Sequence, residues 1–207
     1  MLQISTSILS SQNRIDCIQK LNNTNTDYIH IDTMDGIFVP NTQMPINEII
    51  ELAKYSQKKL DIHLMVEDPL SYINNLQNQN IAFITIHLEI NKDINQIIKQ
   101  IKSFGYKVGL SLKPNTSIQE IIPYLDKIDL ILIMSVEPGF GGQEFIPTSI
   151  DKAKEIRKLN KNIIIEMDGG IKDSNINQIK EHIDIAVVGS YITKNNNYQE
   201  AINNLKN

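Results

Sequence analysis

The sequence predicts an α/β protein folded as a (β/α)8 TIM barrel. Eight short runs rich in β-branched residues alternate with amphipathic stretches of helical period, which is typical of parallel β/α architecture. Histidines, acidic residues and glycines gather where these runs end. The carboxyl ends of the strands meet on one rim in a closed barrel, whereas an open doubly wound sheet spreads them along an edge. The clustering therefore favours the barrel.

The predicted strands follow one another at regular spacing. They are Leu2–Ser7, Tyr28–Thr33, Leu60–Val66, Ala82–His87, Lys107–Leu112, Leu130–Ser135, Ile163–Met167 and Ile185–Val188. Between them, segments such as 46–56 and 91–104 repeat apolar residues every three or four positions, which predicts helices with one buried face. No linker or repeat interrupts the pattern, so we expect residues 1–207 to form a single domain.

Composition limits the classes of partner and compartment. The 207 residues are 41% hydrophobic and carry a net charge of −4, which argues against nucleic acid and anionic membranes as partners. The single cysteine, Cys17, excludes an intrachain disulfide and fits a reducing cytosol. The first residues have no basic segment before their apolar ones, and no apolar run reaches membrane-spanning length. We therefore expect a cytoplasmic protein.

Four residues at predicted strand ends have the chemistry of a metal site. His30 and Asp32 share one face of a strand because side chains alternate with period two, and His63 and Asp168 end two other strands. One such histidine alone would be interpreted as a hydrogen-bonded core residue, but four residues on one rim favour ligation. This mixed nitrogen and oxygen set suits one divalent ion, Zn, Fe(II), Mn or Co.

Glycines mark a second half of the rim. The loop Gly139–Gly142 follows the sixth run, Gly169–Gly170 follows the seventh, and Gly189–Ser190 follows the eighth. Backbone N–H groups without a crowding Cβ bind anions, and the last loops of such barrels often hold phosphate. A sugar phosphate would fit this half and the metal the other half.

Two carboxylates placed across the mouth suggest a reaction. Asp32 and Asp168 come from strands far apart in the barrel order, so they would reach one carbon from opposite faces. One carboxylate can then remove a proton and the other return one, which inverts the carbon. The proton has to lie next to a carbonyl, and the metal would stabilise the resulting enediolate.

Specific motifs strengthen this interpretation. They are Ile4–Ser10, His30–Asn41, Asp61–Pro69, Ile84–Glu89, Met134–Phe145, Met167–Ile171 and Val187–Ile192. Through these segments the chain resembles the ribulose-phosphate 3-epimerase family along nearly its whole length. The resemblance implies a barrel of the ribulose-phosphate-binding type and an isomerase of the pentose phosphate pathway. That enzyme interconverts D-ribulose 5-phosphate and D-xylulose 5-phosphate by metal-assisted two-base transfer at C3.

The resemblance also assigns roles to residues. It implies that His30, Asp32, His63 and Asp168 hold one divalent metal per subunit, and that Asp32 and Asp168 are the acid and base. The residues expected to bind the substrate are Ser7, His63, Gly139, Phe140, Gly141, Gly142, Asp168, Gly169, Gly170, Gly189 and Ser190. Met34, Met65 and Met134 would line an apolar wall; without the resemblance they would be read as core filling. Homo-oligomers are expected.

The chain departs from the family pattern at three places. Thr6 stands where a proline is usual, Ile37 where a histidine is usual, and Gln43–Ile46 where a Gly-Pro is usual. The last two lie in the loop after the second predicted strand, which borders the expected site. His87 and Glu166 are interpreted as interior groups that orient the ligands, or alternatively as a hydrogen-bonded core pair.

Three alternatives remain open at this point. An epimerase for a six-carbon ketose phosphate could share every ligand. A metal-dependent hydrolase on the same barrel would commonly take an HxH pair from the first strand, where this chain has only Ser5, Thr6 and Ser7. A phosphate-binding barrel without catalysis would lack Asp32 or Asp168, and both are present.

Overall fold

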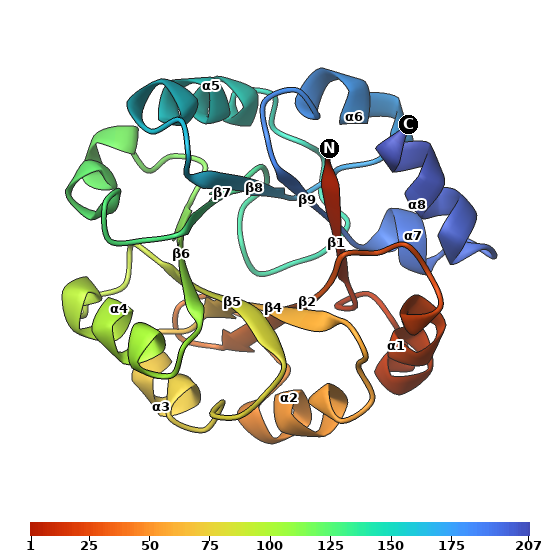
Figure 1. Ribbon diagram of the computed structural model, residues 1–207, viewed down its shortest axis with the longest axis horizontal. Coiled ribbons are helices and arrows are strands. Elements are labelled where there is room, and N and C mark those ends of the chain that lie inside the picture. The colour runs from red at the N-terminus through yellow and green to blue at the C-terminus, as the bar shows by residue number, and fades with distance from the viewer.

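The computed structural model describes residues 1–207 and shows a closed parallel barrel inside a ring of helices (Figure 1). The strands are β1 (Gln3–Ser7), β2 (Tyr28–Asp35), β3 (Thr42–Gln43), β4 (Lys59–Met65), β5 (Ile81–His87), β6 (Lys107–Leu112), β7 (Leu130–Met134), β8 (Ile164–Asp168) and β9 (Ile185–Val188). The sheet order is β1-β9-β8-β7-β6-β5-β4-β2, and pairing of β1 with β2 closes it. The predicted (β/α)8 fold is therefore confirmed.

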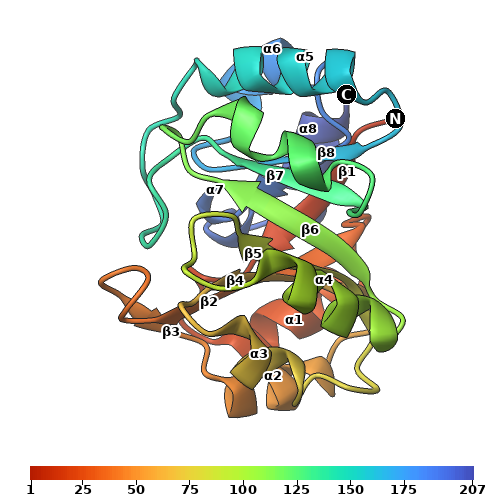
Figure 2. The ribbon, with the colours of Figure 1, turned by 90° about the vertical axis from the view of Figure 1, so that its left-hand side faces the viewer.

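The helices surround the barrel between successive strands (Figure 2). They are α1 (Arg14–Asn22), α2 (Ile46–Ala53), α3 (Pro69–Ile73), α4 (Ile94–Ser103), α5 (Ser149–Leu159), α6 (Asp173–Ile179), α7 (Ser190–Thr193) and α8 (Tyr198–Lys206). Two 3-10 turns, η1 (Ile118–Glu120) and η2 (Ile122–Tyr124), take the place of a helix between β6 and β7. No helix is long and apolar enough to cross a membrane.

The alternating faces of the strands separate two kinds of interior. Outward residues such as Ile29, Ile31 and Ile62 pack in the large apolar core that includes the helices. Inward residues of β7 and β9, among them Leu132 and Val187, form a smaller apolar cluster inside the barrel. The remaining inward positions are largely polar, because β2, β4 and β8 place histidines and carboxylates there.

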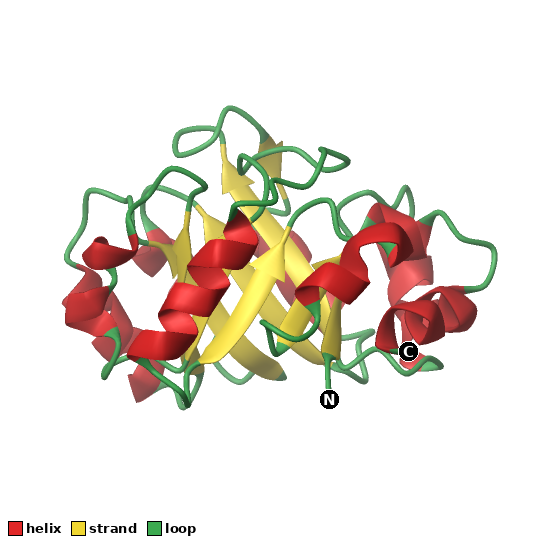
Figure 3. Ribbon diagram, turned by 90° about the horizontal axis from the view of Figure 1, so that it is seen from above, coloured by secondary structure: helices red, strands yellow, loops and turns green.

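The second strand is longer than the sequence predicts. β2 continues to Asp35 because β3 pairs with it antiparallel, Met34 opposite Gln43 and Asp35 opposite Thr42. His30 and Asp32 therefore lie within the strand, and the strand projects beyond the barrel rim. Figure 3 shows the strands running towards a set of loops on one end of the barrel, away from the two termini.

Candidate active site

Strand register brings the predicted ligands to one depth of the barrel. Asp32 of β2 lies beside His63 of β4, and Asp168 ends β8 opposite Met134 of β7. His30 and His63 are fully buried and Asp32 is 3% exposed. Successive side chains of a strand point to opposite faces, and each of these residues occupies a position that faces the barrel interior. The site lies at the carboxyl end of the barrel, where enzymes of this fold place their chemistry.

His30, Asp32, His63 and Asp168 form one group, hereafter the ligand cluster. One nitrogen or carboxylate oxygen from each residue lies within 4.8 Å of those of the other three. Nε2 of His30 is 3.2 Å and Nδ1 of His63 is 3.3 Å from Oδ1 of Asp32. Metal–ligand bonds of about 2 Å place the donors of one ion roughly 3–4 Å apart, so the cluster fits a divalent cation.

Two buried serines and one aspartate hold the ligand cluster in place. Oγ of Ser7 donates to Oδ2 of Asp32 at 2.7 Å. Oδ2 of Asp61 accepts from Oγ of Ser5 at 2.7 Å and lies 2.7 Å from Nδ1 of His30. Because Asp61 occupies Nδ1, Nε2 of His30 is the nitrogen left to face the ligand cluster.

The two aspartates of the ligand cluster differ in their electrostatics. Although burial opposes it, His30 and His63 hold the pKa of Asp32 far below its ordinary value. Burial, followed by the charge of Asp32, raises the pKa of Asp168 to about 7. Burial alone would lower the pKa of His30, but Asp32 and Asp61 outweigh it and raise that pKa well above 6.5. A cation would relieve the repulsion between Asp32 and Asp168.

Glu166 adds another buried carboxyl next to Asp61. Glu166 is fully buried, and burial together with the charge of Asp61 raises its pKa well above 4.5. If both carboxyls are ionised, neither oxygen of Glu166 has a hydrogen-bond partner, and Oδ1 of Asp61 has none either. A protonated Glu166 can donate to Asp61, which would satisfy both carboxyls. His87 and Glu166 do not pair with each other, so the core-pair alternative is wrong.

A cavity of about 430 Å³ opens above the ligand cluster. Asp32 and Asp168 line its floor, and the predicted loops Gly139–Gly142, Gly169–Gly170 and Gly189–Ser190, hereafter the glycine loops, line its side. A Cβ on Gly170 would lie 2.6 Å from the backbone nitrogen of Phe145, and the φ of Gly170 is +64°. Only glycine fits this close approach.

The predicted apolar wall also lines the cavity. Met34, Met65 and Met134 are each 2% exposed and border it together with Ser7. Met34 and Met65 pack with Val39 of the loop after β2. The thioethers thus form an apolar surface beside the carboxyls of Asp32 and Asp168.

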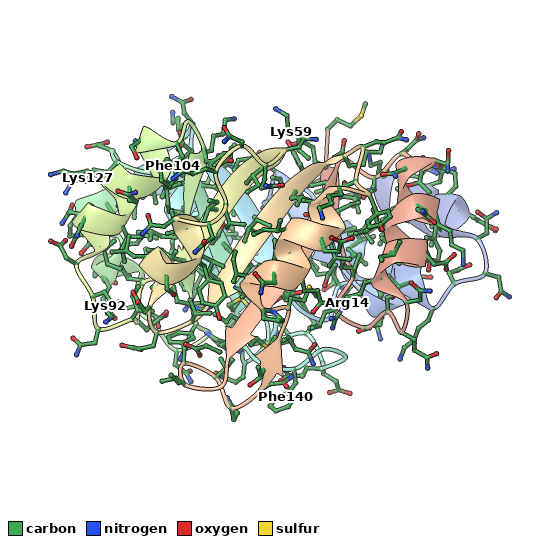
Figure 4. The ribbon with its side chains drawn as sticks, turned by 90° about the horizontal axis from the view of Figure 1, so that it is seen from below. Arg14, Lys59, Lys92, Phe104, Lys127 and Phe140 are labelled. Atoms are coloured by element: carbon green, nitrogen blue, oxygen red, sulfur yellow. The ribbon has the colours of Figure 1, made fainter.

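Loops after β2 and β7 meet over the cavity. Nδ2 of Asn41 donates to the carbonyl of Gly139 at 3.0 Å, and Figure 2 shows both loops projecting on the same side of the barrel. Phe140, 56% exposed, lies at the tip of this end, opposite Lys59 at the start of β4 (Figure 4). The loops bound the mouth without closing it.

The three departures from the family pattern have different structural settings. Thr6 is buried, and its hydroxyl lies 2.7 Å from that of Thr26. Ile37 is 77% exposed at the loop after β2. Met44 replaces the usual glycine with a φ of +45°, and its fully packed side chain contributes to the core. Burial of that side chain offsets the cost of a left-handed backbone.

Several residues of this region were not singled out from the sequence. Asp61 contacts His30, and Lys172 and Asn175 line the cavity beside the glycine loops. Lys172 is the one cationic side chain among the lining residues. The motif DIHLM contains Asp61 two positions before His63 on the same strand face, a period-two signal that could have identified it.

Comparison with known proteins agrees with this geometry. A sequence model of the Ribulose-phosphate 3 epimerase family matches residues 3–193. Ribulose-phosphate 3-epimerase of Helicobacter pylori (strain J99) is 36% identical over 89% of this chain and 87% of its own length. The Bacillus subtilis (strain 168) protein of the same name is 33% identical over 100% and 99% of the two chains.

Solved structures resemble the fold at lower identity. KGPDC from Streptococcus mutans superposes with a TM-score of 0.75 at 14% identity, over 100% of this chain and 96% of the other. 3-Hexulose-6-phosphate synthase from Salmonella typhimurium gives 0.72 at 15% identity, over 99% and 96%. These likenesses support the barrel alone. With the sequence matches and the ligand cluster together, the chain belongs to the ribulose-phosphate 3-epimerase family.

Proposed function

We propose that this protein is a ribulose-phosphate 3-epimerase that interconverts D-ribulose 5-phosphate and D-xylulose 5-phosphate. One observation carries the proposal: Asp32 and Asp168 reach the floor of one cavity from separate strands, with oxygens within 4.8 Å of each other. A ketose whose C3 lies between them presents one face to each carboxylate. Epimerisation needs that arrangement, because the proton leaves one face and another arrives on the opposite face.

The protonation states of the two aspartates suit opposite roles. Asp32, whose pKa is held low, is ionised and can accept the C3 proton. Asp168, with a pKa near 7, can carry the proton that is delivered to the other face. In the reverse direction the two roles exchange. Neighbouring carboxyls with pKa values pushed apart are the expected signature of an acid and base pair.

We further propose that the ligand cluster holds one divalent cation, Zn, Fe(II), Mn or Co, through His30, Asp32, His63 and Asp168. When bound, the cation would stabilise the negative charge of the enediolate that forms on proton removal. The protein residues orient the donors: Asp61 fixes His30, and Ser7 fixes Asp32. Met34 and Met65 exclude water from the reacting carbons.

The glycine loops and Lys172 support a phosphate at the far side of the cavity. Backbone N–H groups in left-handed or turn conformations form concave anion sites, and Gly142, Gly169 and Gly170 all have positive φ. Lys172 adds the cavity's one positive side chain. The substrate is therefore bound at two ends, with its phosphate on the glycine loops and its carbonyl region over the ligand cluster.

Deuterium incorporation tests this function. The metal-loaded protein is incubated with ribulose 5-phosphate in D2O, and C3 is followed by NMR. We expect deuterium at C3 together with xylulose 5-phosphate, and no reaction with Asp168→Asn. An inert C3 in the metal-loaded protein would overturn the proposal.

The same sample separates the alternatives. A hydrolase would release inorganic phosphate without deuterium at C3, and a non-catalytic barrel would bind the sugar and leave C3 unlabelled. Paired kinetics with a six-carbon ketose phosphate measure substrate length preference. We expect the higher kcat/KM with the five-carbon substrate.

A further inference from the structure

A line of buried contacts leads from the ligand cluster through the neighbouring strands β4 and β5 to the carboxylate of Glu89. Nε2 of His63 lies 2.9 Å from Nε2 of His87, and Nδ1 of His87 lies 3.1 Å from Oε2 of Glu89. Both imidazoles are fully buried. His87 is interpreted above only as an interior group that orients the ligands, without a contact or a mechanism, and Glu89 has no role in the proposed function.

Glu89 is fixed as an acceptor by two further donors. Its Oε1 accepts the backbone N–H of Lys113 at 2.7 Å and the hydroxyl of Thr116. Nζ of Lys152 holds the same loop by donating to the carbonyls of Lys113 and Thr116, at 3.0 and 2.6 Å. The carboxylate therefore has one oxygen occupied and the other directed at His87, which has to present an N–H to it.

Because Glu89 can only accept, it sets the donor and the acceptor of every hydrogen bond from Glu89 back to His63. With its proton on Nδ1, neutral His87 has a lone pair on Nε2. The short contact between the two Nε2 atoms needs one N–H and one lone pair, so His63 donates from Nε2. Neutral His63 then has its lone pair on Nδ1, the atom 3.3 Å from Asp32 in the ligand cluster. The opposite tautomer would place an N–H where a cation is expected.

We propose that His87 and Glu89 are positioning residues that hold His63 in the tautomer whose Nδ1 lone pair faces the ligand cluster. The inference rests on the proposed function in one respect, that the ligand cluster takes a divalent cation. It differs from the arrangement at His30, where Asp61 contacts the imidazole directly. At His63 the orienting carboxylate acts through a second imidazole.

Loop residues cover this line of contacts. The ring of Phe38, from the loop after β2, lies 4.7 Å from that of His87 at 41°. Nζ of Lys113 lies 4.0 Å from the centre of the Phe38 ring. Phe38 thus separates His87 from the mouth, which keeps water from competing for its nitrogens.

Nitrogen NMR tests the tautomers directly. The chain has four histidines, so ring 15N labelling of histidine gives a spectrum with few signals, recorded on the metal-free and the zinc-loaded protein. We expect His63 protonated on Nε2 and His87 protonated on Nδ1 in the zinc-loaded protein. His87 protonated on Nε2, or zinc on Nε2 of His63, would overturn the proposal.

Paired variants separate positioning from packing. The side chain of His87→Gln can still accept from His63, whereas that of His87→Leu fills space without accepting. We expect Co²⁺ affinity to fall about 10- to 100-fold in His87→Leu and to stay within about threefold in His87→Gln. Equal loss in both, with unchanged circular dichroism, would mean that His87 only packs. His182→Gln, remote from the ligand cluster, serves as the control.

Glu89→Gln tests the carboxylate end. Its amide can present an N–H to His87, reverse both tautomers and place a proton on Nδ1 of His63. We expect weaker Co²⁺ binding and a changed cobalt absorption spectrum; an unchanged affinity and spectrum would overturn the role of Glu89. Because these measurements do not involve turnover, expected tautomers without C3 exchange would refute the proposed function alone.

Discussion

Asp32 on β2 and Asp168 on β8 converge although β1 and β9 separate their strands on one side and β4 to β7 on the other. Their environments push the two pKa values in opposite directions: His30 and His63 outweigh burial at Asp32, whereas burial and the charge of Asp32 raise that of Asp168. The two carboxyls therefore differ in proton affinity before any substrate binds.

Replacing either aspartate should abolish epimerisation. Asp32→Asn and Asp168→Asn each remove one proton-transfer group, which lowers kcat by about 10²–10⁴-fold. The rate is measured by NMR, and metal content is measured on the same samples because both residues belong to the ligand cluster. A variant that keeps more than roughly a tenth of the activity would contradict the two-base assignment.

Ser7→Ala should leave Asp32 in place but less firmly oriented. The variant loses the 2.7 Å hydrogen bond to Oδ2 of Asp32, and hydrogen bonds to charged groups contribute about 1.5–3 kcal/mol. The pKa of Asp32 should rise, which moves the acidic limb of the pH–kcat profile to higher pH. The loss of orientation should lower kcat about tenfold. Ser10→Ala, which also lines the cavity, should leave that limb in place.

Metal affinity should rise with pH through neutrality. In the metal-free protein the pKa of Asp168 is about 7, and a cation competes with that proton for the carboxyl. Below pH 7 we expect each bound ion to release the proton of Asp168 and that of His30, whose pKa lies well above 6.5, measured by calorimetry in buffers of different ionisation enthalpy. Asp168→Asn should bind metal more weakly and release one proton fewer. Chelator treatment should abolish C3 exchange, and divalent metal should restore it.

Glu166→Gln should flatten the pH dependence of stability. Burial and Asp61 raise the pKa of Glu166 above 4.5 on folding. The folded state therefore holds this proton more tightly, and the free energy of unfolding falls as pH rises above 4.5. Glutamine carries no such proton, so metal-free Glu166→Gln should lose less stability between about pH 5 and about pH 8. Denaturant unfolding measures it, with exposed Glu155→Gln as the control.

Gly170→Ala should weaken substrate binding in addition to the stability that it loses through backbone strain. Its Cβ would collide with the backbone of Phe145 in the cavity wall, whereas Gly105, with a φ of +81°, has open space around its Cβ position. Both variants should lose about 1 kcal/mol or more from the left-handed backbone. Only Gly170→Ala should also raise KM. Equal KM values in the two variants would contradict the proposed phosphate position.

The sequence alone determined the strand alternation and the barrel. It also determined that His30 and Asp32 share a face and that His63 and Asp168 lie towards the carboxyl ends of their strands, on the same rim. These features are local, because side-chain period and strand polarity follow from the backbone itself. The eight predicted strands all form, with ends shifted by at most two residues, as at β8, which ends at Asp168. The added strand β3 could not be predicted from two residues of no distinctive pattern.

Tertiary structure decided which groups meet and which carry protons. Pairing of β2 with β4 brings Asp61 beside His30, and closure of the barrel brings Glu166 of β8 to Asp61. The line from His63 through His87 to Glu89 depends on the register of β4 with β5 and on the loop after β6. A pKa is set by burial and by neighbouring charges, and neither exists until the strands have closed.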